Sequence, residues 1–449
     1  MAWVMSHLIN NQMKSSFLLA LLLPVMAWGQ SIAEKADQLL TAYVAQKKFS
    51  GNVLIAKEGR IVFQKSYGMA DRARRQPNTL QTEFRVGSLS KMFTATAILQ
   101  LEEEGKLSLT DPVAQFVPHF PYGNQIQIRH LLSHTSGIQG AATTTPEPTN
   151  LTESVERFRY DSLAFKPGEK FEYNNFNFIL LSYIAERASG KKLSQLLQTG
   201  IFQPLGMKQT GLDANDRTSA YKSVGYVTNP RTQAWEPETS ANVALASGAG
   251  ALYTTLGDLY KWSQAVSAHT VLNAAAAQKA LTPVQAGYGL GWMINQKNGR
   301  TGYGHTGSIE GYLAYFMKYP KEDVTIIFLS NYRYANGQQL ASDLTAIAFN
   351  ELYTLPQLRK EVILSAAVLN RYAGDYQLKE GFVVKVSVEN NKLYVLAPGE
   401  KDKVELSPVN ETQFVLKGPE IEMEFLKENE KVQYLFIKMQ GGLKLTKIS

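Results

Sequence analysis

The chain contains no cysteine among its 449 residues, and that absence removes several kinds of chemistry at once. Disulfide bonds, a cysteine nucleophile and lipid attachment at an N-terminal cysteine are all excluded. Histidine is scarce as well, with six residues. His130 and His134 have the i and i+4 spacing of a helical metal site, but no acidic third ligand accompanies them. We therefore expect no metal and no cofactor.

The sequence also lacks the signatures of nucleotide and nucleic-acid binding. Its glycine-rich stretches at 248–250 and 287–291 are without the strand, turn and helix context of a phosphate loop, and no Gly-x-Ser-x-Gly elbow occurs. The 46 basic and 39 acidic residues are mixed along the chain, which is typical of a solvated surface rather than a nucleic-acid stripe. We expect no nucleic-acid partner, and a loose attraction to an anionic envelope polymer stays open.

Long hydrophobic runs are absent except near the N-terminus. Residues 1–29 contain Lys14, then an apolar run over 17–26, then small or polar residues before Gln30, a pattern typical of a secretion signal cleaved near Gly29 and Gln30. The run is short for a membrane span, so we expect a periplasmic or secreted protein with no transmembrane anchor after signal removal. A retained anchor is the alternative, and Met13 is an alternative start.

Three short motifs follow one another in the remaining chain: Ser88-x-x-Lys91, Tyr173-x-Asn175 and His305-x-Gly307. Each is weak alone, because similar spacings recur elsewhere. The competing matches are Ser189 with Lys192, Ser219 with Lys222, Tyr122 with Asn124, and Tyr334 with Asn336. The local context of each match has to decide among them.

Ser88 has the context of an activated nucleophile. It follows a strand-like run at 84–87 and opens an apolar segment, 89–101, that predicts a buried helix. Residues three apart on a helix are neighbours, so Lys91 can reach the Ser88 hydroxyl and act as its base if burial lowers the lysine pKa. The alternative is a lysine that extends from a core helix toward water. Ser189 with Lys192 is better interpreted as a polar helix end.

Tyr173 lies between a turn at 166–168 and a helical pattern over 177–188. Its phenol could relay the serine proton, and Asn175 could donate to Lys91 or to a substrate carbonyl. The alternative is a tyrosine packed under a loop.

The third motif is followed by strand-like runs at 315–319 and 324–330. Gly307 would let a strand edge approach substrate closely, and His305 could contact the substrate or leaving group. The backbone N–H groups of Ser308 and Ser88 could form an oxyanion hole. A histidine in a glycine-rich turn is, alternatively, an ordinary solvated residue.

Taken together, these motifs resemble those of the serine β-lactamase and penicillin-binding protein superfamily, in order and approximate spacing. The stretches at 130–137, 165–168, 204–207 and 287–292 resemble its class C branch. The resemblance covers roughly residues 35–350. It implies that Ser88 is acylated, that Lys91 and Tyr173 transfer protons, and that His305, Thr306, Gly307 and Ser308 form the substrate-binding strand.

His305 departs from part of that superfamily. β-Lactamases and many transpeptidases carry lysine at this position, and a neutral imidazole binds a substrate carboxylate less well at pH 7. His-x-Gly resembles the branch of esterases, D-aminopeptidases and other peptidases. We therefore expect an ester, amide or peptide substrate, with cell-wall fragments among the candidates, and only weak action on β-lactams.

The expected fold is α+β, with an antiparallel sheet flanked by helices and a helical subdomain over residues 30–355. A helix near 32–46 precedes a hairpin of strands at 51–56 and 60–66, which should pair with the late strands in one sheet. The loop 140–150 could border the cleft. Residues 360–449 alternate apolar and polar positions and predict a small antiparallel β-barrel, similar to the lipocalin-like domains attached to some members of the family.

The sequence thus predicts an exported serine hydrolase acting through an acyl-Ser88 intermediate. The alternative is a protein of the same fold that binds penicillin or peptidoglycan fragments with little turnover.

Overall fold

The computed structural model describes residues 30–449 apart from 140–148, 230–233, 239–241, 334–336, 357–361, 401, 417–420, 430 and 439–441. The expected signal segment, most of the loop 140–150 and the competing pair Tyr334 and Asn336 lie outside the described residues. Within the described part of the chain, no helix is long and apolar enough to cross a membrane.

A six-stranded antiparallel sheet forms the centre of the first body. Its order is β10-β11-β12-β13-β1-β2, so the hairpin at the start of the chain pairs with β13 near residue 330, as the sequence predicts. The strands are β1 Gly51–Lys57, β2 Arg60–Tyr67, β10 Met293–Lys297, β11 Arg300–Ile309, β12 Tyr312–Tyr319 and β13 Val324–Ser330.

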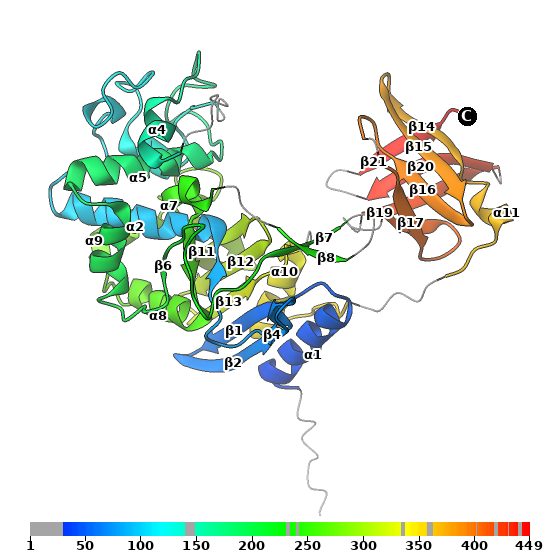
Figure 1. The fold of residues 1–449 in the computed structure, drawn as a ribbon, viewed down its shortest axis with the longest axis horizontal. Coiled ribbons are helices and arrows are strands. Elements are labelled where there is room, and N and C mark those ends of the chain that lie inside the picture. The colour runs from blue at the N-terminus through cyan, green and yellow to red at the C-terminus, as the bar shows by residue number, and fades with distance from the viewer. Residues whose placement is uncertain are drawn as a thin grey trace, which may run out of the picture.

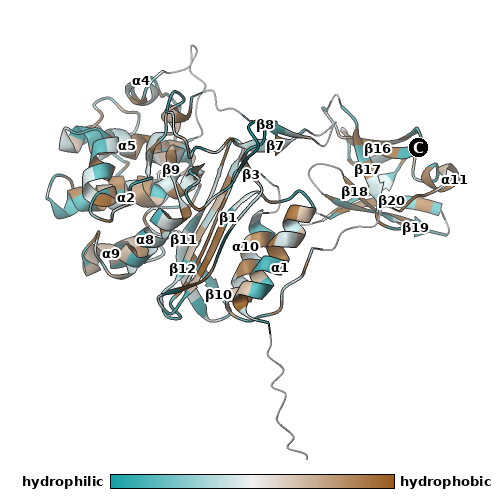
Figure 2. Ribbon diagram, turned by 60° about the horizontal axis from the view of Figure 1, so that its bottom comes forward, coloured by the Kyte–Doolittle hydropathy of each residue, from teal (hydrophilic) through white to brown (hydrophobic). Residues whose placement is uncertain are grey.

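Helices cover both faces of this sheet, which makes three layers (Figures 1 and 2). Helices α1 (Ile32–Ala45) and α10 (Gly337–Ala348) lie on one face, and α2 (Ser90–Glu103) and α8 (Leu256–Ser267) lie on the other. Two apolar clusters follow from this arrangement, one for each face of the sheet. The central strand β13 contributes to both and is buried along its whole length, as expected for a strand covered on both sides.

The helical subdomain holds most of the remaining elements. Its helices are α3 Ile128–Leu132, α4 Leu151–Glu156, α5 Asn175–Ser189, α6 Leu193–Leu197, α7 Ser247–Gly250 and α9 Ala274–Leu281, with short helical turns at η1 Gly87–Leu89, η2 Val113–Gln115, η3 Gln198–Phe202 and η4 Val243–Ala246. Short strands connect them: β3 Met69–Asp71, β4 Gln76–Pro77, β5 Phe84–Arg85, β6 Gly211–Leu212, β7 Tyr226–Thr228, β8 Trp235–Pro237 and β9 Leu252–Thr254.

The C-terminal body is a closed antiparallel barrel of eight strands, which confirms the expected small β-barrel. Its interior is filled by side chains, among them Tyr372, Tyr376, Phe414 and Phe425. The likeness to lipocalin-like domains stays a prediction. Helix α11 (Ala366–Leu369) leads into β14 Gly374–Lys379, β15 Phe382–Glu389, β16 Lys392–Leu396, β17 Val404–Pro408, β18 Gln413–Leu416, β19 Glu422–Glu428, β20 Lys431–Lys438 and β21 Leu443–Lys447.

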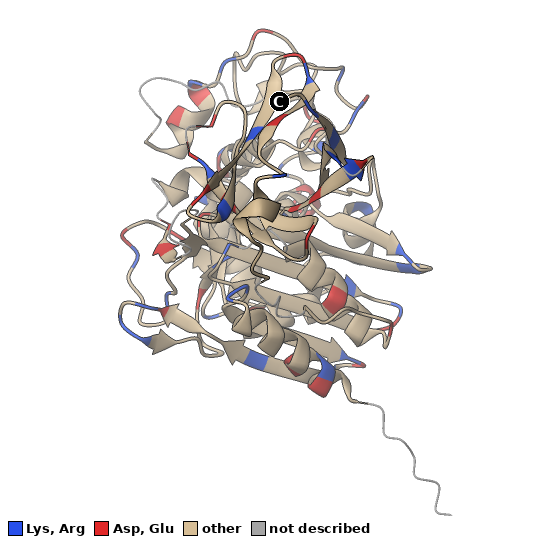
Figure 3. Cartoon of the chain, turned by 90° about the vertical axis from the view of Figure 1, so that its right-hand side faces the viewer, with Lys and Arg blue, Asp and Glu red and all other residues tan. Residues whose placement is uncertain are grey.

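Basic and acidic residues are interspersed along the elements seen in Figure 3. This distribution agrees with the mixed charge of the sequence.

Candidate active site

Ser88 occupies a tight turn between a strand and the central helix. Strand β5 runs into η1, which begins at Gly87 with φ +50°, and α2 follows at Ser90. The Val86 N–H donates to the carbonyl of Leu252, and the Leu252 N–H donates to Ser90 Oγ. Strand β9 therefore fixes the chain on both sides of Ser88.

Lys91 lies one helical turn after Ser88 and is completely buried. Its Nζ is 2.9 Å from Ser88 Oγ, 2.8 Å from Asn175 Oδ1 and 2.8 Å from the Ala249 carbonyl oxygen. Burial lowers the pKa of Lys91 to about 7. The predicted contact between Ser88 and Lys91 is thus present in the structure.

The three neighbours suit a neutral Lys91 amine. A neutral amine has two N–H bonds and one lone pair, and Asn175 Oδ1 and the Ala249 carbonyl are both acceptors. The lone pair is then left for the hydroxyl proton of Ser88, which is the geometry of a base next to its nucleophile. The expectation that Asn175 donates to Lys91 is wrong, because Asn175 Oδ1 accepts from Lys91. Donation from Asn175 to a substrate carbonyl stays a prediction.

Tyr173 lies over Lys91 at the loop that leads into α5. Lys91 Nζ is 4.9 Å from the centre of the Tyr173 ring. Burial raises the pKa of Tyr173 to about 12, and a hydrogen bond with Ser88 opposes that rise. The phenol therefore carries its proton at neutral pH and is in reach of the serine oxygen. The α5 N-terminus is capped by Asn174, whose side chain accepts from the Phe176 N–H.

His305 is brought to the same site, but its side chain is buried. Its Nε2 is 3.0 Å from the Tyr288 hydroxyl, and its Nδ1 faces the Thr306 carbonyl. Burial and the nearby Lys91 lower the pKa of His305 to about 3, so the imidazole is neutral at pH 7. With Nδ1–H donating to the carbonyl, Nε2 accepts from Tyr288. The fixed positive charge that a lysine would supply is absent here.

Strand β11 presents part of its edge to the cavity. Strand β10 pairs with residues 300–304 of β11, and among the described strands none pairs with 305–309 on that side. The segment lies against the turn that carries Ser88: a Cβ built at Gly307 would come within 2.0 Å of the Val86 carbonyl oxygen. Gly307 thus permits the close packing of β11 on η1.

A cavity of about 400 Å³ lies over these groups. Its lining includes Ser88, Tyr173, His305, Thr306, Gly307 and Ser308. The three motifs, which are spread over more than 200 residues of the sequence, therefore share one cavity, with Lys91 and Asn175 behind Ser88.

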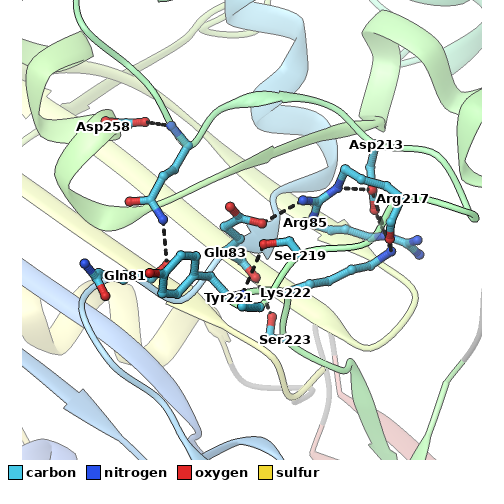
Figure 4. Close-up of polar contacts among 12 residues, drawn as sticks. Gln81, Glu83, Arg85, Asp213, Arg217, Ser219, Tyr221, Lys222, Ser223 and Asp258 are labelled. Carbon is cyan, nitrogen blue, oxygen red and sulfur yellow. Dashed lines mark hydrogen bonds and ion pairs between the residues drawn. The ribbon is translucent and has the colours of Figure 1, made fainter.

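A buried ion-pair network supports the strand before Ser88 (Figure 4). Arg85 Nε lies 2.7 Å from Asp213 Oδ2, Arg217 Nε lies 2.6 Å from Asp213 Oδ1, and a second Arg217 nitrogen lies 2.7 Å from Glu83. Burial alone would raise the pKa of Asp213, but the hydrogen bonds and charges of Arg217 and Arg85 hold it below its usual value. No sequence motif marks these residues.

The competing matches lie elsewhere. Ser189 ends α5 with its hydroxyl on the Ala185 carbonyl, and Lys192 pairs with Glu186. Lys222 Nζ donates to the Arg217 carbonyl, and Tyr122 donates to the Asp161 carbonyl.

His134 is also buried, with its ring centre 4.3 Å from that of Tyr173. Its Nδ1 accepts from the Asn174 N–H. Across the described ranges, no group of three or more metal-binding side chains is found.

Comparison with known proteins agrees with this geometry. The family model described as Beta-lactamase matches residues 36–348. The chain belongs to this family. A second model, described as a domain of unknown function (DUF3471), matches residues 358–448, the region of the barrel.

Some relatives of this beta-lactamase family member are named as penicillin-binding proteins. Penicillin-binding protein 4* of Bacillus subtilis (strain 168) is 31% identical over 84% of this chain and 90% of that protein. The crystal structure of a penicillin-binding protein from Bacillus halodurans is 30% identical, with a TM-score of 0.61 over 69% of this chain and 98% of that one. The D-amino acid amidase of Ochrobactrum anthropi SV3, at 20% identity and a TM-score of 0.60 over 70% and 97% of the chains, shows the same fold.

Two groups at the site were missed by the sequence interpretation. Ala249 acts through its backbone carbonyl, which no motif can reveal. Tyr288 lies in the stretch 287–292 that resembles the class C branch, but its hydrogen bond to His305 depends on the fold.

Proposed function

We propose that this protein is an exported serine hydrolase that cleaves ester or amide bonds through an acyl-Ser88 intermediate. The observation that carries the proposal is the distance of 2.9 Å between Lys91 Nζ and Ser88 Oγ, at the base of an open cavity. Export rests on the pattern of residues 1–29.

In the first step, Ser88 Oγ attacks the substrate carbonyl carbon while its proton passes to the Lys91 amine. The oxygen of the carbonyl becomes an oxyanion, which the backbone N–H groups of Ser88 and Ser308 would stabilise. The bond to the leaving group then breaks, and the leaving nitrogen or oxygen takes a proton through Tyr173. Tyr173 then regains a proton from Lys91, which holds the proton that it took from Ser88.

In the second step, water attacks the acyl carbon. Tyr173 or Lys91 takes a proton from the water, the acid is released, and Ser88 recovers its proton. The unpaired edge of β11 at 305–309 supports an extended substrate, because its backbone can pair with a peptide laid beside it.

The neutral His305 favours esters and amides over β-lactams. β-Lactams carry a carboxylate beside the reacting ring, and this site has no fixed cation from the third motif to bind it. The structural neighbour named as a D-amino acid amidase makes amides of D-amino acids the first amides to test after an ester.

The decisive experiment uses protein beginning at Gln30 and a short p-nitrophenyl ester. We expect p-nitrophenol release and a transient acyl adduct on Ser88 by intact mass, both lost in Ser88→Ala. Amides of D- and L-amino acids, and a penicillin, would then rank the substrates.

A folded protein that gave no turnover and no adduct would favour the second candidate function, which is a binding protein with the same fold. Ser88→Ala that binds peptidoglycan fragments as tightly as the parent protein would support that candidate.

A further inference from the structure

A second cavity, of about 370 Å³, lies between α10 and the end of the sheet formed by β10, β11 and β12. We call it the α10 groove. It does not contain Ser88, and none of the three motifs contributes to its lining. The groove is lined by, among others, Asn295, Lys297, Arg300, Ser342, Thr345 and Glu351.

The α10 groove continues from the cavity at Ser88. Tyr315, Gln338 and Ala341 line both cavities, so the two meet along α10 and β12. The unpaired part of β11, residues 305–309, lies beside the first of them. A chain bound along that edge would therefore lie next to the groove as well as to Ser88. Because one extended residue spans about 3.4 Å, only a substrate of several residues reaches so far.

The side chains of the groove fit a peptide. Asn295 and Ser342 contribute polar side chains to the lining, and an amide and a hydroxyl can both hydrogen-bond to backbone amide groups. The Tyr315 ring forms an aromatic wall where the groove meets the first cavity.

The far end of the groove carries a net positive charge. Arg300 lies 4.1 Å from the centre of the Phe349 ring and pairs with Glu351. Lys297 is exposed and has no ion-pair partner in the described part of the chain. Two cations therefore face one carboxylate, which favours an anionic group on the ligand.

We propose that the α10 groove is a second subsite, which binds the distal, carboxylate-bearing end of an extended peptide whose scissile bond lies at Ser88. This inference rests on the proposed function for the position of the scissile bond. It adds the length and the charge of the substrate.

The test uses two series of esters that carry zero to four glycine residues. One series extends the acyl side and the other extends the leaving-group side, and each chain ends in either a carboxylate or a carboxamide. Glycine removes the question of stereochemistry. We expect kcat/KM to rise at least fivefold with length in one series, and further for the carboxylate than for the carboxamide. Equal rates at all lengths in both series would overturn the subsite.

Two variants locate the effect in the groove. Ser342→Trp should fill it and remove the dependence on length, and Lys297→Glu should remove the preference for a carboxylate. Both should hydrolyse p-nitrophenyl acetate within twofold of the parent protein. Lys208→Glu, the same charge reversal at an exposed lysine outside the groove, is the control and should keep both preferences. A length effect that survives Ser342→Trp would show that the subsite is elsewhere.

A binding measurement distinguishes failure of this inference from failure of the proposed function. In Ser88→Ala, calorimetry measures the groove without turnover, and two comparisons cover both chain directions: succinyl-tetraglycine amide against acetyl-tetraglycine amide, and acetyl-tetraglycine against the same amide. Tighter binding of one carboxylate compound, lost on adding Lys297→Glu, is expected even if the parent protein hydrolyses no ester. Equal binding in both comparisons would overturn the carboxylate assignment.

Discussion

The backbone of Gly87 lies directly against that of Ser308. A Cβ built on Gly87 would come within 2.8 Å of the Ser308 carbonyl oxygen. The residue before the nucleophile is therefore held against the residue whose N–H we assign to the oxyanion hole.

Gly87→Ala should disturb this contact. Its left-handed φ costs a non-glycine residue about 1–2 kcal/mol, and the new methyl group would push β11 away from η1. We expect a loss of unfolding free energy and a fall of at least tenfold in kcat/KM. Gly105→Ala is the matched control, because Gly105 has φ +68° and nothing within 4 Å of its built Cβ. If both variants kept full activity, the contact would have no role in catalysis.

The lowered pKa of Lys91 predicts how acylation depends on pH. Below about 7 the amine is protonated and cannot accept the Ser88 proton, so the acylation rate should rise about tenfold per pH unit and level off above pH 7. Quenched reactions followed by intact mass measure this rate. A rate that is flat between pH 5 and pH 9 would contradict Lys91 as the base.

The same shift has a consequence for stability. Lys91 is charged in the unfolded chain up to its ordinary pKa of 10.5 but is neutral in the folded protein above about 7. The unfolded state therefore binds more protons in this window, and stability rises with pH there. Relative to Lys91→Met, the unfolding free energy should increase by about 1.4 kcal/mol per pH unit from pH 7 to pH 9. Urea denaturation at three pH values measures it, and the same pH dependence in the parent protein and in Lys91→Met would contradict the lowered pKa of Lys91.

Tyr173→Phe removes the phenol and keeps the ring over Lys91. Loss of a proton-transferring group lowers rates by about 10²–10⁴, so we expect a fall of that size in kcat with little change in melting temperature. Tyr122→Phe, at a competing motif, should leave kcat unchanged. Equal effects of the two substitutions would argue against a chemical role for Tyr173.

The buried network predicts a large effect for Asp213→Asn. Arg85 and Arg217 would lose the carboxylate that neutralises them, and breaking a buried pair in this way costs about 3–5 kcal/mol. Asp37→Asn is the comparison, because Asp37 and its partner Lys65 are both partly exposed and such pairs contribute about 0–1 kcal/mol. Similar losses in the two variants would show that the network adds no special support.

The sequence predicts contacts between site residues that are close in the chain better than contacts between residues that are far apart in it. Ser88 and Lys91 are three residues apart on one helix, so helical geometry alone places them together. The strands β1 and β13 are recognisable as short apolar runs, and the β-barrel is recognisable from strands that alternate apolar and polar positions. Family resemblance, rather than local pattern, brings Tyr173 and His305 to Ser88.

Contacts between distant residues without a motif could not be predicted. Arg85 and Asp213 are 128 residues apart, and each is an ordinary charged residue in the sequence. The burial of His305 is a similar case, because it depends on Tyr288 and on the packing of β11, whereas the sequence alone left a solvated turn as an alternative.

The unpaired edge of β11 also bears on solubility. An open strand edge can pair with any extended chain, including another copy of the protein, and is a common starting point for aggregation. Among the described residues, the open stretch of β11 is 305–309, and it lies beside a cavity bordered by Tyr173. The edge is short, so a full-length strand from a neighbouring molecule would gain few backbone bonds by docking on it.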